Sequence, residues 1–181
     1  MSPNAIKRLS TFHPERPMPK IFRLVKNGKL IEGVYEGETL NTPSMFCVAD
    51  ALDSLMWIKE IGGLTETIRR SNENFKCLQG WVDKTPWIEN LVSDPRNRSN
   101  TSVCLKFSDE RLISLIPDEK TRFVKEFVAL LEAENAAFDI KGHRNAPPGL
   151  RIWCGATINL DDIQKLLPWL EYCFHEIISS Y

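Results

Sequence analysis

The sequence predicts an α+β fold in which a short mixed or antiparallel sheet carries helices on one face. From about residue 64 onward, the patterns follow the order helix, strand, helix, strand, strand, helix. Upstream, apolar residues flank Asn27-Gly28, a dipeptide typical of two-residue hairpin turns. Of the 181 residues, 43% are hydrophobic and 26% are charged, as in a globular chain with an apolar core.

Residues 1–62 are predicted to form a connector, a hairpin and a helix. Four prolines exclude a helix through the second half of residues 1–20, namely Pro3, Pro14, Pro17 and Pro19. The hairpin is expected over residues 21–35. The helix is expected to begin at Pro43, with Thr42 as its N-cap, and to end at Gly62-Gly63.

Residues 63–181 are predicted to form a separate domain, which begins with a helix that Pro86 ends. The buried face of this helix is expected to consist of Leu64, Ile68, Phe75, Leu78 and Val82. Two later helices begin at Pro117 and after Asn159, and the last continues through Pro168 because its apolar spacing does. Strands are expected at 101–107, 137–140 and 150–154, with a polar loop at 93–100.

Composition excludes several classes of protein. With 23 basic and 24 acidic residues, the net charge of −1 argues against a strongly basic nucleic-acid-binding protein. No run of 18 apolar residues predicts a membrane helix, and the first residues do not resemble a signal peptide. The five cysteines form no CxxC pair, so we expect buried, reduced thiols in a cytoplasmic protein. His13, His143 and His175 lack the spacing of zinc ligands, which argues against a metal site.

Three polar segments are candidates for anion binding. Asn41-Thr42 precedes a predicted helix, whose free N–H groups can hold a phosphate, although an ordinary N-cap explains the pattern as well. His143-Arg144 follows Lys141-Gly142 and could clamp a dianion, or form a solvated basic turn. Arg151 alternates with apolar strand residues and faces either a carboxylate-binding pocket or solvent. No nucleophile, Walker or dinucleotide motif is present, and the five tryptophans are expected to be packing residues.

Five segments together resemble the phosphoserine aminotransferase family, in the form found in alphaproteobacteria. They are PMPKIFR (17–23), KLIEG (29–33), NTPSM (41–45), RSNTSVC (98–104) and APPGLRIWCGAT (146–157). The resemblance covers nearly the whole chain and corresponds to the C-terminal part of a fold-type-I enzyme that uses pyridoxal phosphate. It implies that 1–62 is a segment of the large domain and 63–181 the small domain.

The resemblance implies a substrate and a role for each candidate residue. The family transfers an amino group between glutamate and 3-phosphohydroxypyruvate, giving phosphoserine and 2-oxoglutarate, in serine and in some bacteria pyridoxine biosynthesis. Its members are homodimers with active sites built from both subunits. Asn41 and Thr42 match the pair that binds the cofactor phosphate across the dimer. His143 and Arg144 match the pair that binds the substrate phosphate. Arg151 matches the arginine that binds the substrate carboxylate. The expected picture is these cations converging on one small dianion.

The same resemblance places the Schiff-base lysine upstream of the matched stretch. Lys20, Lys26 and Lys29 do not stand in the family's lysine context and are expected to be solvated. Because that lysine holds the cofactor and moves the α-proton, the isolated chain is expected to be inactive. The alternative interpretation is a non-catalytic anion-binding or dimerisation module with the small-domain fold.

Overall fold

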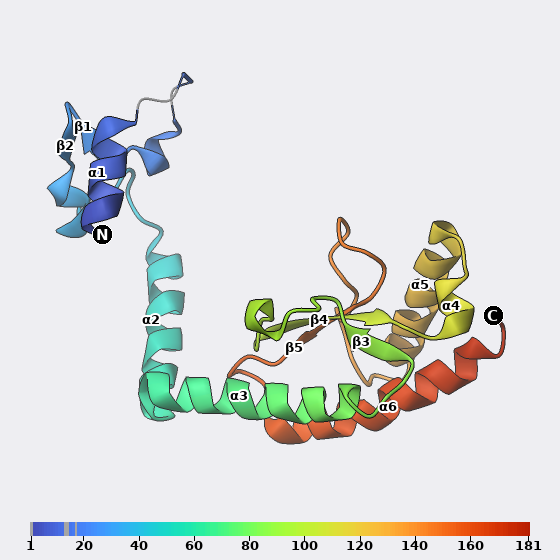
Figure 1. Ribbon diagram of the computed structural model, residues 1–181. Helices are drawn as coiled ribbons and strands as arrows, with labels where there is room; N and C mark the ends of the chain where they lie inside the picture. The colour runs from blue at the N-terminus through green and yellow to red at the C-terminus, as the bar shows by residue number, and fades with distance from the viewer. Residues whose placement is uncertain (1, 13–14, 17) are drawn as a thin grey trace. The chain divides into compact units, whose positions relative to one another are not determined.

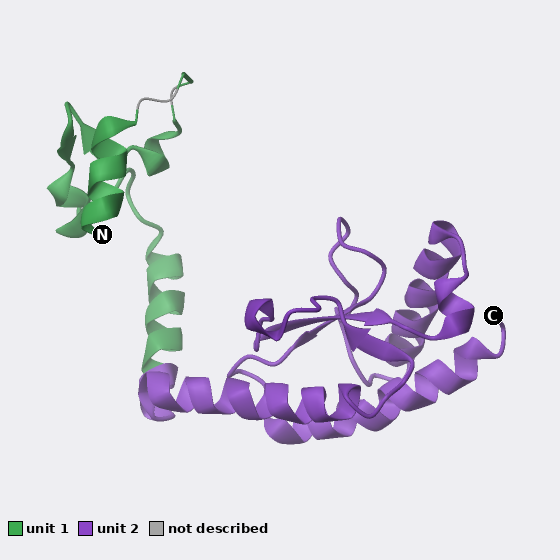
Figure 2. Cartoon of the chain, viewed as in Figure 1, with its two compact units in different colours: residues 1–56 green, residues 57–181 purple. Residues whose placement is uncertain are grey.

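The structure is a computed structural model that describes residues 2–12, 15–16 and 18–181. The chain divides into two compact units, residues 1–56 and 57–181 (Figure 2). Met1, His13, Pro14 and Pro17, which the sequence analysis used, lie outside the described residues.

The first unit contains a helix that the sequence analysis did not predict. Helix α1 spans Pro3–Thr11, with Ser2 as N-cap: its hydroxyl oxygen accepts the Ala5 N–H at 3.3 Å. Short 3-10 turns follow at Lys20–Phe22 and Glu32–Tyr35. Pro3 occupies the first helical turn, where a missing N–H costs nothing, so a proline there favours a helix start rather than excluding one.

The predicted hairpin is confirmed but is shorter than expected. Strands β1 (Val25–Lys26) and β2 (Lys29–Leu30) pair antiparallel. The turn residues Asn27 and Gly28 have φ of 51° and 73°. Positive φ at both positions is what a type I′ turn requires, which explains the choice of Asn and Gly.

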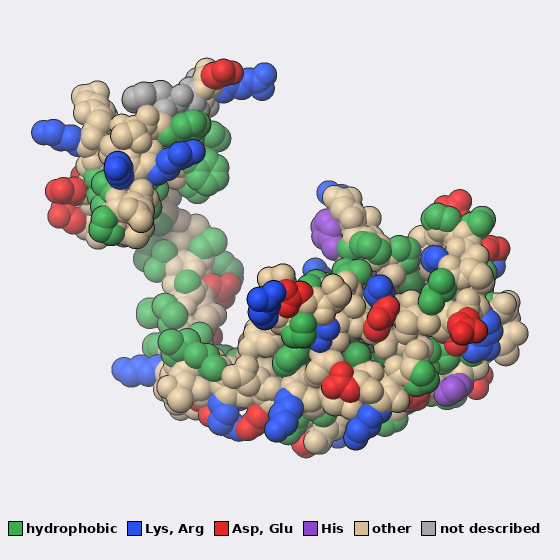
Figure 3. Space-filling model, viewed as in Figure 1, with side chains coloured by type: hydrophobic (Ala, Val, Ile, Leu, Met, Phe, Trp, Pro, Cys, Tyr) green, Lys and Arg blue, Asp and Glu red, His purple; other side chains and the backbone are tan. Residues whose placement is uncertain are grey.

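Helix α2 (Met45–Glu60) begins two residues later than predicted. Ser44, rather than Thr42, is the capping residue, because its hydroxyl accepts the Cys47 N–H at 3.4 Å and its carbonyl accepts the Val48 N–H. The predicted end is confirmed: Gly62 and Gly63 have φ of 117° and 72°, and α3 begins at Gly63. Apolar side chains are exposed along α2 (Figure 3), among them Met45, Phe46, Leu52 and Leu55.

The second unit is a three-stranded antiparallel sheet with helices on one face (Figure 1), as the sequence predicted. The sheet order is β3-β4-β5. Strands are β3 (Ile88–Asn90), β4 (Ser102–Phe107) and β5 (Leu150–Trp153), and helices are α3 (Gly63–Val82), α4 (Glu110–Ile113), α5 (Pro117–Ala133) and α6 (Leu160–Ile178). Helix α6 packs against both α3 and α5 and is continuous through Pro168.

Alternating side chains of the strands build the core between the sheet and the helices. Val103 and Leu105 of β4, and Leu150 and Ile152 of β5, are at most 3% exposed. They meet the aromatic side chains of α5 and α6, and Phe174 stacks on Trp87 with ring centroids 4.1 Å apart. The intervening strand residues lie on the other, open face of the sheet.

Other differences from the predictions have local causes. Strand β3 and helix α4 were missed, because three- and four-residue elements show no periodicity. Residues 137–140 are not a strand: positive φ at Asn135 and Asp139 breaks the extended backbone, leaving one bridge between Lys141 and Leu150. Leu64 and Ile68 are exposed, so only the second half of α3 packs on the core.

The cysteine expectation was correct for part of the set. Cys154 and Cys173 are buried, Cys77 and Cys104 are half-buried, and Cys47 is exposed, with all five unpaired. Within the described ranges, no helix is long and apolar enough to span a membrane. Across those same ranges, no three His, Cys, Asp or Glu side chains gather into a possible metal site.

Candidate functional site

Asn41 and Thr42 lie in the first unit, in the extended segment just before α2. Both are exposed, and neither side chain hydrogen-bonds to another described residue. An amide NH₂, a hydroxyl and the free N–H groups of the first turn of α2 are donors that suit a phosphate. The donor chemistry of this segment therefore fits the phosphate of a cofactor.

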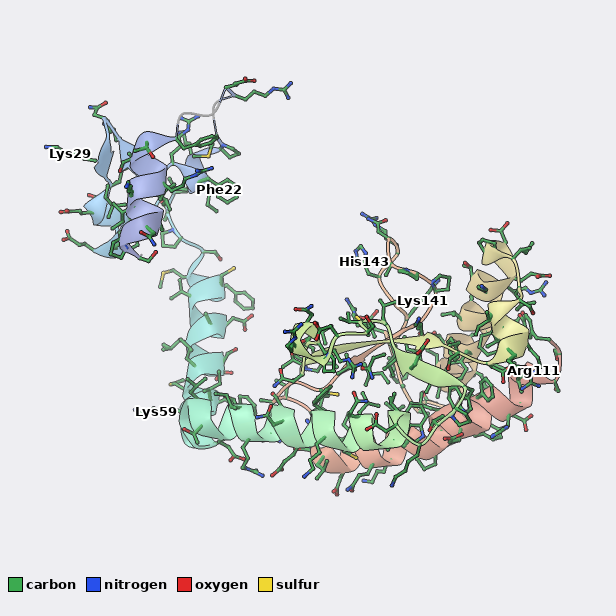
Figure 4. The ribbon with its side chains drawn as sticks, in the orientation of Figure 1. Phe22, Lys29, Lys59, Arg111, Lys141 and His143 are labelled. Carbon is green, nitrogen blue, oxygen red and sulfur yellow. The ribbon has the colours of Figure 1, made fainter. Side chains whose placement is uncertain are left out.

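A narrow neck at residues 140–142 and 149–151 positions the basic loop between them. The Gly142 N–H donates to the Gly149 carbonyl at 2.9 Å, and the Arg151 N–H donates to the Ile140 carbonyl at 2.7 Å. Gly149 is required here, because a Cβ at this position would clash with the backbone oxygen of Leu105 in β4. The loop projects from the sheet with His143 near its tip (Figure 4).

His143 and Arg144 line a hollow of about 180 Å³ together with Lys141, and Thr121 and Val124 of α5 form its wall. The Asn145 N–H donates to His143 Nδ1 at 3.2 Å. An accepting Nδ1 places the proton of neutral His143 on Nε2, which becomes the donor available to a ligand. Both side chains are exposed, so this hollow offers three cationic or donor groups to an anion.

Arg151 lies on the open face of the sheet, in a different hollow of about 380 Å³. It is opposite Cys104 in the register of β4 and β5, and its side chain is 40% exposed. Arg151 Nη2 lies 3.5 Å from Asp139 Oδ2. Phe138 and Trp153 also line the hollow, and Trp153 Nε1 donates to Thr157 Oγ1 at 3.0 Å. The guanidinium is thus accessible to a carboxylate between two exposed aromatic side chains.

The structure brings His143 and Arg144 together but places Arg151 apart from them. Arg151 pairs with Ile140 across the neck, and His143 is three residues further along. At the rise of an extended chain, this separation is about 10 Å along the backbone. The two hollows share no lining residue. Within one chain, Arg151 and the His143-Arg144 pair thus line two separate hollows.

Sequence reasoning missed three residues of the Arg151 hollow. Trp153 was expected to be a packing residue, but it is half exposed, and its alternation with Arg151 could have placed both on one face. Phe138 and Asp139 were assigned to a strand. Their position depends on the positive φ of Asp139, a conformation that aspartate tolerates but that its presence alone does not predict.

The two buried cysteines, Cys154 and Cys173, do not offer a nucleophile. Burial, with a smaller contribution from Cys77, raises the pKa of the Cys154 thiol to about 12. Burial likewise raises the pKa of Cys173 to about 11. Both thiols are therefore protonated at neutral pH.

Comparison with models of protein families finds no match. Comparison with curated proteins finds phosphoserine aminotransferases from Methanosarcina mazei and Methanosarcina barkeri. The first is 44% identical over 96% of this chain and the second 44% identical over 97%. These alignments cover 44% and 45% of the two relatives, so the chain spans less than half of their length.

Solved structures show the same fold. A phosphoserine aminotransferase from Bacillus circulans subsp. alkalophilus superposes with a TM-score of 0.64 and 24% identity, covering 79% of this chain and 36% of that one. A pyridoxal-phosphate-bound phosphoserine aminotransferase from Trichomonas vaginalis gives a TM-score of 0.62 at 22% identity over 76% of this chain and 36% of that one. The fold is that of part of a fold-type-I transferase, and the chain is homologous to a portion of phosphoserine aminotransferase.

Proposed function

We propose that this chain supplies the substrate-binding portion of a phosphoserine aminotransferase, which transfers an amino group between glutamate and 3-phosphohydroxypyruvate. The observation that carries the proposal is a pair of accessible hollows, each lined by an arginine, in a chain 44% identical to phosphoserine aminotransferases over 96% of its length. A substrate with a phosphate at one end and a carboxylate at the other requires two such sites.

Each hollow suits one end of that substrate. The planar fork of Arg151 can bind the α-carboxylate through two parallel hydrogen bonds. His143 Nε2 and the Arg144 guanidinium can donate to the phosphate. Asn41 and Thr42 would hold the phosphate of pyridoxal phosphate, which supplies the electron sink when bound.

The separation of the two hollows supports a dimer in which active sites are shared. The hollow of Arg151 and the hollow of His143 and Arg144 lie next to the same neck but share no lining residue. We infer a homodimer in which a substrate binds Arg151 of one subunit and His143 and Arg144 of the other. The exposed apolar side chains of α2 are the kind of surface that such an assembly covers.

The unpaired thiols favour a reducing compartment, the cytoplasm.

The test is to fuse this chain to the part of the Methanosarcina mazei protein that it does not match. With pyridoxal phosphate, L-phosphoserine and 2-oxoglutarate, the fusion should show sustained amino transfer, because it regains the residues that hold the cofactor. The 181-residue chain alone should show none. The complete Methanosarcina mazei protein is the positive control.

Two outcomes would contradict the proposal. Turnover by the isolated chain would contradict the inactive-portion interpretation. A folded fusion that binds pyridoxal phosphate, as its absorbance shows, yet transfers no amino group from L-phosphoserine would favour a non-catalytic binding or dimerisation module.

A further inference from the structure

The Arg151 hollow contains an anion of its own. Asp139 is the only carboxylate within 4 Å of the Arg151 guanidinium among the residues that the structure describes, with 3.5 Å between Nη2 and Oδ2. Both residues line the same hollow. Arg151 has five N–H donors, and the distance to Asp139 is at the long limit of a hydrogen bond, so most of its donors remain available.

Asp139 has no evident structural role that would explain its position. Its side chain is 91% exposed, it caps no helix, and among the described residues it forms an ion pair with Arg151 alone. Its φ of 53° lies in the left-handed region, where Asp and Asn are tolerated better than other non-glycine residues. The neck at Ile140 fixes the backbone beside it through the Arg151 N–H bond at 2.7 Å. The neck therefore holds the Asp139 backbone beside the hollow, while the exposed side chain is free to turn.

We propose that Asp139 is a competing counter-ion that a ligand carboxylate must displace from Arg151. A ligand that binds the fork bidentately brings a second negative charge to a guanidinium that already faces one. The two carboxylates then compete for one cation and repel each other. Since Asp139 is exposed, its side chain can turn into water when the ligand binds. The free energy needed to break the Asp139–Arg151 ion pair then lowers the apparent affinity for carboxylates. This inference rests on the proposed carboxylate-binding role of Arg151.

The test is ligand titration of the 181-residue chain and its Asp139→Asn variant. Asparagine has the same shape and accepts the left-handed backbone, so the fold is retained. The probe is L-phosphoserine, and the signal is the NMR shift of the Trp153 indole N–H, which belongs to the same hollow. Asp139→Asn should tighten L-phosphoserine binding about 2- to 5-fold, the range expected for an exposed ion pair.

Two controls isolate the cause. O-phosphoethanolamine has the phosphate and the amine of L-phosphoserine but lacks the carboxylate, so its affinity, followed by the phosphorus NMR shift of the ligand itself, should be the same for both proteins. Glu132→Gln makes the same change in net charge at an exposed position of α5 outside the hollow, and it should leave L-phosphoserine affinity unchanged.

The outcomes separate this inference from the function on which it rests. If Arg151→Ala weakens L-phosphoserine binding but Asp139→Asn does not tighten it, the counter-ion role is wrong and the carboxylate site stands. Equal tightening of O-phosphoethanolamine would also overturn the counter-ion role, since it would show a general charge effect. If the wild-type chain does not bind L-phosphoserine, or Arg151→Ala does not alter its binding, the carboxylate site and the counter-ion both fail.

Discussion

Arg151 lies between Leu150 and Ile152, two side chains that are each 1% exposed. This alternation is visible in the sequence, and it left two options for the arginine, solvent or a pocket. The structure supplies what the pattern lacked: a hollow with Phe138, Asp139 and Trp153 around the guanidinium. Of the site, the basic residues could be predicted from the sequence, whereas their neighbours depend on the backbone turn at Asp139.

The role of Arg151 can be tested by a change that preserves its charge. In the fusion protein, Arg151→Lys loses the planar fork and should raise the free energy of the transition state by about 2–4 kcal/mol. The measurement is kcat/KM for L-phosphoserine. Arg96→Lys, at an exposed arginine paired with Asp94, is the matched control and should leave kcat/KM unchanged. An unaltered value for Arg151→Lys would reject the carboxylate-binding role.

At the scale of elements, strong apolar periodicity predicted the long helices and strands, whereas very short elements have no periodicity from which to predict them. The long helix α5 and strand β4 lie where their apolar spacing predicted them, and α6 continues through Pro168. Strand β3 has three residues, and its formation depends on pairing with β4 rather than on its own pattern. The start of α2 moved to Met45 because Ser44 competes with Thr42 as a cap.

One polar cluster connects α3, α6 and the segment before β3. Glu171 of α6 accepts the indole N–H of Trp81 at 2.8 Å and that of Trp87 at 3.2 Å. The Thr85 hydroxyl donates to the Trp81 carbonyl at 2.8 Å, and its oxygen lies 3.4 Å from the same carboxylate. Trp87 is 5% exposed, so its N–H has no ready access to water. A single carboxylate therefore satisfies two indole donors beside the core.

Removing this carboxylate should destabilise the second unit. Glu171→Ala leaves the Trp87 N–H without a partner, at a cost of about 1–3 kcal/mol in the free energy of unfolding. Urea unfolding followed by tryptophan fluorescence measures it. Glu176→Ala removes an exposed carboxylate from the same helix and should have little effect. Equal losses for the two variants would show that the indole contacts contribute nothing specific.

At the scale of the whole molecule, the α+β class and the one-sided sheet were predictable, since both follow from the order and period of the apolar residues. The arrangement of the anion sites was not. The family resemblance implied a common site for His143, Arg144 and Arg151. The extended neck instead holds the two hollows on different parts of the surface.

The central claim is that this chain recognises a phosphate and a carboxylate in separate hollows. The most direct measurement is kcat/KM of the fusion protein for L-phosphoserine and for L-serine, with and without Arg144→Ala. Arg144 is exposed, and its guanidinium has no hydrogen-bond partner among the described residues, so the variant should fold normally. We predict a loss of about 1.5–3 kcal/mol with L-phosphoserine and almost none with L-serine, which lacks the phosphate. Equal losses with both amino acids would contradict the claim.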